Sequence, residues 1–196
     1  RIMLVGDGAE RERLQQTAEE RELDNIIFTG LLPKEQMPEI LDAADICLVH
    51  LKKKDLFKRV LPSKIFEMAA MGKPIILGVE GCAAELLNQA DAGICIEPEN
   101  ADELVNALVD FADDPEKRHR HGLSGHHFVY RYFDRRNLAE SYLNIIHQVV
   151  EGKADIHPIR NWISDGSAFS AMDQSVQIEE DATVLEKSSE QDNQAA

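Results

Sequence analysis

The stretch Leu61-Pro62-Ser63-Lys64-Ile65-Phe66-Glu67, followed by Gly72-Lys73-Pro74, carries the clearest structural signal in this chain. Pro62 and Ser63 predict the start of a helix, Lys64 falls in its first turn, and Glu67 stands one turn after Ser63. Such a helix start offers free N–H groups to a phosphate, and the lysine adds a positive charge. The glutamate can accept paired hydrogen bonds from two neighbouring hydroxyls. Together these residue types predict a site for a sugar nucleotide.

Burial decides how Glu67 is interpreted. The alternative to a ligand role is an intrahelical pair with Lys64, three residues away, which contributes only a few tenths of a kcal/mol. The neighbouring residues 65–71 are otherwise apolar, which predicts a largely buried helix. A buried carboxylate needs a strong partner. We therefore favour a ligand role for Glu67.

Strand and helix patterns alternate on both sides of this stretch. Apolar runs predict strands at Ile2–Val5, Ile26–Thr29, Ile46–Val49, Ile75–Val79 and Gly93–Ile96. Helical periodicity covers 9–22, 34–43, 63–71, 82–90 and 101–112, with two further helices at 115–131 and 135–150. The alternation predicts an α/β fold, a Rossmann-like doubly wound parallel sheet with helices on both faces.

The two ends of the chain differ from this regular middle. Arg1 already stands at the edge of a strand pattern, so we expect the domain to lack its first, central strand. In a doubly wound sheet this predicts either a gap or a direct ladder between Leu4 and Leu48, and an unstable or aggregation-prone isolated chain. The domain is expected to cover 1–150. The acidic, aperiodic segment 151–196 is predicted to be disordered, although Trp162 within Ile159–Ile163 offers an apolar docking patch.

Composition excludes several classes of function. The 196 residues are 43% hydrophobic, enough for a core, and the net charge of -15 argues against nucleic acid as a partner. No apolar run reaches the roughly 18–20 residues that span a bilayer, and the start does not resemble a signal peptide. These features predict a cytoplasmic protein. The cysteines Cys47, Cys82 and Cys95 lack metal-ligand spacing and are interpreted as small buried hydrophobes.

Gly6-Asp7-Gly8 follows the first strand, where a doubly wound sheet turns its loops toward a ligand. The geometry of the turn explains these two glycines as well as a ligand does. The third glycine of a dinucleotide fingerprint is absent, and the sequence contains no GxxxxGK[ST] motif. NAD and ATP enzymes are therefore disfavoured.

Other polar clusters allow weaker hypotheses. The basic cluster Lys52-Lys53-Lys54 with Lys58 and Arg59 is either a solvated loop or an attractor for a diphosphate or an anionic membrane surface. Ser63 has no His and acidic partner at recognisable positions, which gives a hydrolase triad no support. Four histidines lack accompanying ligands at metal spacing and are interpreted as a solvated helix face; they are His119, His121, His126 and His127.

An ordered series of motifs resembles the C-terminal, donor-binding half of family 4 glycosyltransferases, which have the GT-B architecture and retain the anomeric configuration. The series comprises Leu4–Gly8, Phe28–Gly30, Ala44–Asp45, Leu61–Glu67, Gly72–Pro74 and Ala92–Gly93. It is most similar to bacterial members that transfer amino sugars or deoxy sugars in capsule, O-antigen or colanic acid assembly. The resemblance covers residues 1–150 and implies a UDP- or GDP-linked sugar donor, no metal and no further cofactor.

The resemblance also implies roles for single residues. Glu67 matches the glutamate that holds the ribose hydroxyls, and Pro62, Ser63 and Lys64 match the helix start that binds the diphosphate. Gly30 and Leu31 match the turn beside the base, and Gly6 and Gly8 match the preceding loop. Glu85 matches a glutamate on the sugar side.

Arg59 stands where the family has its first paired glutamate, which leaves the catalytic residues unassigned. The resemblance places the glycan or lipid-linked acceptor on an N-terminal half that we expect to be missing, so the isolated fragment should be inactive. The intact enzyme would act in the cytoplasm, with peripheral association at the inner face of the plasma membrane. The alternatives are a non-catalytic nucleotide-sugar-binding remnant and a sugar-nucleotide epimerase of the same architecture.

Overall fold

The computed structural model describes residues 1–152, except for the side chain of Asn137. The predicted disorder of the tail and the docking of Trp162 concern residues outside this described part. None of the helices in this part combines the length and the hydropathy of a transmembrane span.

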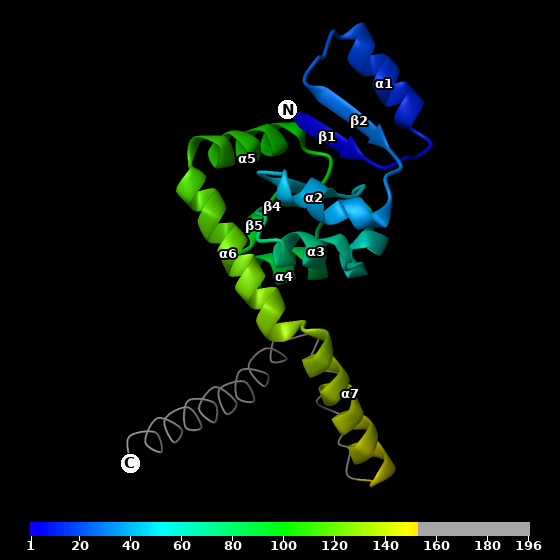
Figure 1. The fold of residues 1–196 in the computed structure, drawn as a ribbon, viewed down its shortest axis with the longest axis vertical. Coiled ribbons are helices and arrows are strands. Elements are labelled where there is room, and N and C mark those ends of the chain that lie inside the picture. The colour runs from blue at the N-terminus through cyan, green and yellow to red at the C-terminus, as the bar shows by residue number, and fades with distance from the viewer. Residues whose placement is uncertain (153–196) are drawn as a thin grey trace.

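Strands and helices alternate in the predicted order (Figure 1). The strands are β1 (Ile2–Val5), β2 (Ile26–Gly30), β3 (Cys47–His50), β4 (Ile75–Gly78) and β5 (Gly93–Cys95). The α-helices are α1 (Arg11–Glu20), α2 (Met37–Asp42), α3 (Lys64–Ala70), α4 (Cys82–Gln89), α5 (Ala101–Asp113), α6 (Pro115–Tyr132) and α7 (Arg135–Val150). Two short 3-10 helices, η1 (Lys34–Gln36) and η2 (Asp55–Arg59), lie in the loops.

The strands form two parallel sheets rather than one. β1 pairs with β2, and β3, β4 and β5 form a second sheet in that order. No ladder joins β1 to β3 within residues 1–152. Of the two arrangements predicted for Leu4 and Leu48, the gap is therefore observed, and the direct ladder is not formed.

The second sheet carries the hydrophobic core. Successive residues of a strand point to opposite faces. Accordingly, Ile75 and Leu77 join the cluster formed with α3 and α4, while Ile76 packs with Phe111 of α5 on the other face. All three β4 side chains are fully buried. This sheet is covered on both faces, as the continuous apolar run Ile75–Val79 predicts.

Helix α6 runs along the second sheet (Figure 1), and its glycines permit a close approach. A Cβ on Gly122 would lie 2.1 Å from the carbonyl oxygen of Gly72, and a Cβ on Gly125 would lie 2.8 Å from the Cβ of Ala92. Gly72 itself ends the α3 region with a φ of +66°, which favours glycine. Glycine is thus needed at these positions for helix packing. α7 extends away from the two sheets (Figure 1), with most of its apolar side chains exposed.

Candidate functional site

The loop after β3 leads from the carboxyl end of the second sheet into α3, the helix that carries the Pro62–Glu67 stretch. Ligands of open α/β sheets bind at this end of the strands. Ser63 is the residue that precedes α3, so the predicted helix start is confirmed, and its side chain makes no capping hydrogen bond. The amides of Ile65 and Phe66 donate to the carbonyls of Pro62 and Ser63, each at 3.1 Å. The amides of Ser63 and Lys64 have no such partner among the described residues.

Lys64 and Glu67 are both exposed on α3. The prediction that Glu67 is buried is wrong, because a residue two positions from both Ile65 and Ala69 lies on the opposite side of the helix from these buried residues. The alternative pair between Lys64 and Glu67 is not formed either. Neither side chain has a hydrogen bond or an ion pair within residues 1–152. Both charges are therefore available to a ligand.

The basic cluster of the preceding loop is partly neutralised by acidic residues. Lys53 pairs with Glu97, which follows β5, and this hydrogen bond raises the pKa of the lysine and lowers that of the glutamate. Lys58 pairs with Asp55 at 2.9 Å, and this contact raises the lysine pKa and lowers the aspartate pKa. Glu80, which follows β4, lies 3.7 Å from the same lysine. These pairs weaken the case for a membrane-binding basic patch.

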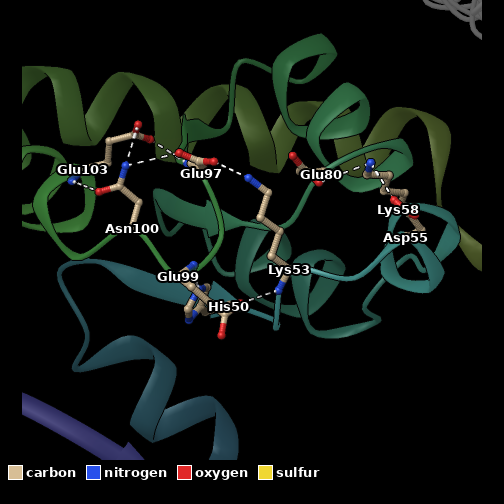
Figure 2. Close-up of polar contacts among 9 residues, drawn as sticks. All are labelled: His50, Lys53, Asp55, Lys58, Glu80, Glu97, Glu99, Asn100 and Glu103. Carbon is tan, nitrogen blue, oxygen red and sulfur yellow. Dashed lines mark hydrogen bonds and ion pairs between the residues drawn. The ribbon is translucent and has the colours of Figure 1, made fainter.

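Figure 2 shows a polar network that joins the carboxyl ends of β3 and β5. The amide of Glu99 donates to Nε2 of His50 at 2.8 Å, and the amide of Lys53 donates to Oε2 of Glu99 at 3.0 Å. Because Nε2 of His50 is the acceptor, the imidazole proton is on Nδ1. Glu99 adopts a left-handed φ of +65°. The network fixes the loop after β5 against the loop after β3.

This network was not predicted from the sequence. His50, Lys53 and Glu97 stand at or just after the ends of two parallel strands, and such ends meet at one edge of a sheet. That rule could have placed the residues together. The loop after β5 also lines an open hollow of about 410 Å³, bounded by residues 97–102. Its acidic lining, with Glu97, Glu99 and Asp102, disfavours a phosphate there.

The glycines predicted for the site lie on the first sheet. The amide of Gly6 donates to the carbonyl of Gly30 at 3.0 Å, and both have a positive φ. Gly8 has open space around it, and Leu31 is 79% exposed. The structure therefore brings Gly6 and Gly30 together at the carboxyl ends of β1 and β2.

The predicted site residues thus form two groups on two sheets. The first holds the glycine loops and Leu31, and the second holds Pro62, Ser63, Lys64 and Glu67. No hydrogen bond or ion pair among the described residues joins the groups. Arg59, at the end of η2, and Glu85, in the first turn of α4, are both exposed, and α4 contacts η2.

Two predictions about side-chain environment need correction. His121 is buried, with Nδ1 2.7 Å from the carbonyl oxygen of Asp91, because α6 packs against the loop before β5. His126 is half-buried beside the carbonyl of Ala70 at 2.7 Å, whereas His119 and His127 are exposed as predicted. The described residues contain no cluster of His, Cys, Asp and Glu that could hold a metal.

The cysteines are only partly as predicted. Cys47 is buried in β3, whereas Cys82 and Cys95 are half-buried. Burial raises the pKa of the Cys95 thiol to about 11 and also raises the pKa of Cys47. Both strand cysteines are therefore protonated at neutral pH.

A family model, Glycosyl transferases group 1, matches residues 1–144. The chain belongs to this family of glycosyl transferases. The chain is 23% identical over 154 residues to the O-antigen chain mannosyltransferase C of Escherichia coli, a match that covers 78% of this chain and 41% of the relative.

A second relative is the GDP-mannose-dependent monoacylated alpha-(1-6)-phosphatidylinositol monomannoside mannosyltransferase of Corynebacterium glutamicum. It is 29% identical over 147 residues, which cover 74% of this chain and 38% of the relative. The chain thus spans about two fifths of the length of these relatives.

A solved structure, HepE of Anabaena in complex with UDP-glucose, has a TM-score of 0.59 and 22% identity. The match covers 72% of this chain and 40% of HepE. This likeness supports the GT-B fold, of which the described residues match the C-terminal half.

Proposed function

We propose that this chain binds the nucleotide-sugar donor of a retaining glycosyl transfer in bacterial surface polysaccharide synthesis. The observation that supports the proposal is the pair of free charges at the start of α3. Lys53 and Lys58 in the preceding loop are paired with carboxylates, whereas Lys64 and Glu67 are exposed and unpaired within residues 1–152. A nucleoside diphosphate supplies a partner for each of these two charges.

In this proposal the two charges have separate roles. The amides of Ser63 and Lys64 and the ammonium of Lys64 hold the diphosphate. The carboxylate of Glu67 accepts hydrogen bonds from the two ribose hydroxyls. Glu85 lies on the sugar side, and the turn at Gly30 and Leu31 lies beside the base. No metal and no further cofactor is required.

The residues act by positioning and electrostatics. Negative charge grows on the diphosphate as the sugar leaves, and the helix start and Lys64 stabilise that charge. The acceptor hydroxyl, from a glycan or a lipid-linked sugar, attacks from the same face as the departing diphosphate. We assign the acceptor site to residues outside the described domain.

A second candidate is nucleotide-sugar binding without turnover. The observation that favours it is Arg59, which occupies the position where the resemblance expects a glutamate facing the donor sugar. Turnover of UDP- or GDP-sugars in the presence of an acceptor glycan would distinguish transfer from binding alone.

Calorimetry with UDP and GDP tests the donor site directly. Glu67→Gln should weaken nucleoside diphosphate binding by roughly 30- to 150-fold, which corresponds to loss of a charge-assisted hydrogen-bond pair of roughly 2–3 kcal/mol. Lys64→Ala should weaken the diphosphate more than the nucleoside. Glu39→Gln, an exposed carboxylate on α2, is the matched control. Unchanged affinity in Glu67→Gln, or equal losses of both ligands in Lys64→Ala, would contradict the assignment.

A further inference from the structure

Arg11 opens α1 and lies across the carboxyl ends of β1 and β2. Its guanidinium rests against Gly30, where an added Cβ would lie 3.3–3.5 Å from three guanidinium atoms. Gly30 also has a φ of +68°. The close approach and the backbone conformation both favour glycine at this position, and together they leave room for the guanidinium above the strand end.

The hydrogen-bonding capacity of Arg11 is poorly used. Nη1 lies 3.7 Å from Oδ1 of Asp7, too far for a hydrogen bond. Nε is buried and has no acceptor among the described residues. The side chains of Arg11 and Asp7 are 35% and 47% exposed, respectively. A guanidinium normally presents several donors to carboxylates, phosphates or base edges, and here the two Nη groups are the donors that an acceptor from outside the chain can meet.

Asp7 lies beside these donors and is held in place locally. Its Oδ1 accepts a hydrogen bond from the amide of Gly8 at 2.8 Å. The Asp7 carboxylate, whose oxygens accept hydrogen bonds, therefore lies next to the Arg11 guanidinium, whose N–H groups donate them. Leu31, at the end of β2, adds an exposed apolar surface on which the flat face of a base can lie.

The order of donors and acceptors selects a base. Guanine presents two adjacent acceptors, N7 and O6, which arginine contacts in bidentate fashion, followed by two adjacent donors, N1–H and the 2-amino group. Uracil presents one donor between two acceptors and matches an Arg–Asp pair less well. We propose that Arg11 and Asp7 recognise guanine, which makes the donor a GDP-linked sugar. The proposal rests on the proposed donor-binding function.

Calorimetry on the full 196-residue chain tests this with three probes, GDP, UDP and inosine diphosphate, which lacks the 2-amino group. GDP should bind at least roughly tenfold more tightly than UDP, as expected for one bidentate base contact. Arg11→Lys should weaken GDP and inosine diphosphate by roughly tenfold and leave UDP almost unchanged. Asp7→Asn should weaken GDP more than inosine diphosphate, because only guanine offers both donors.

Arg13→Lys is the matched control, since Arg13 pairs with Glu10 on the exposed side of the same helix at 2.5 Å. Its affinities should equal those of the unmodified chain. Tighter binding of UDP than GDP, or equal losses for GDP and UDP in Arg11→Lys, would overturn guanine recognition while leaving donor binding intact. Binding of neither nucleotide would overturn the proposed function and the guanine assignment together.

Discussion

Both sheets of this domain consist of parallel strands, but they differ in how far their side chains are buried. The four side chains of β1 are 38–47% exposed, whereas Ile75, Ile76 and Leu77 of β4 are 0% exposed. β4 has a strand on each side and helices on both faces, whereas β1 pairs only with β2 within residues 1–152. Burial removes apolar surface from water, so the second sheet supplies most of the hydrophobic stabilisation. The first sheet carries the glycine turns and Arg11 with little core of its own.

Shortening one buried leucine should show the largest contrast. Leu77→Ala in β4 should lower the free energy of unfolding by about 2–5 kcal/mol, because it leaves a cavity in a fully packed core. The matched change Leu4→Ala in β1 removes a side chain that is 40% exposed and should cost under about 1 kcal/mol. Urea denaturation followed by circular dichroism measures both. Similar losses would show that the two sheets unfold as one cooperative unit with equal packing.

A methyl group added at the helix contact should show the next largest effect. Gly122→Ala forces α6 away from Gly72 and should destabilise the second sheet region by about 1–3 kcal/mol. Gly8→Ala, in the loop of the first sheet, meets no atom within 4 Å and should be close to neutral. Thermal denaturation of the two variants provides the comparison. An unchanged melting temperature in Gly122→Ala would show that α6 does not pack closely against Gly72 in solution.

The core of the second sheet can be predicted from the sequence, whereas the exposure of the site residues is harder to predict. A continuous apolar run such as Ile75–Val79 has few environments other than a covered strand. The exposure of Glu67 follows from its helical phase relative to Ile65 and Ala69, which a count of apolar neighbours ignores. The gap beside β1 could also be predicted, because the order of a doubly wound sheet separates the first and third of these strands.

The polar network and Arg11 could not be predicted in the same way. The contact of His50 with Glu99 joins residues 49 positions apart and depends on a left-handed backbone conformation at a glutamate. Periodicity carries no information on such a turn. In the sequence, Arg11 is one of several charged residues of an amphipathic helix. Its approach to Gly30 and its buried Nε distinguish it from Arg13 and are visible only in the structure.

The exposed strand of the first sheet should also govern self-association. In the described part of the chain, one edge of β1 pairs with no strand, and its four apolar side chains are partly exposed, which are features that promote edge-to-edge pairing. Leu4→Lys should therefore reduce aggregation of the purified chain in light scattering. Val105→Lys, an equally apolar exposed position on α5, is the control and should have less effect. Equal reductions in both variants would indicate a general charge effect rather than strand pairing.

The smallest effect concerns the contact between Lys53 and Glu97 at the carboxyl end of the second sheet. Lys53 lowers the pKa of the Glu97 carboxyl below its ordinary value of 4.5, so the stabilisation from this pair is present above that value and is lost as pH falls through the lowered pKa. The pKa of Lys53 is raised above 10.5, so its contribution is lost only as pH rises beyond that raised value. The pair is exposed, and its effect on overall stability should be small.

An NMR titration of the Glu97 carboxyl should show a midpoint below 4.5 that returns toward this value in Lys53→Met. The midpoint of Asp55, which pairs with Lys58, should not move. An unshifted Glu97 midpoint in the unmodified chain would show that the loop after β5 is not held by Lys53 in solution, and the contrast between the two sheets would then rest on apolar packing alone.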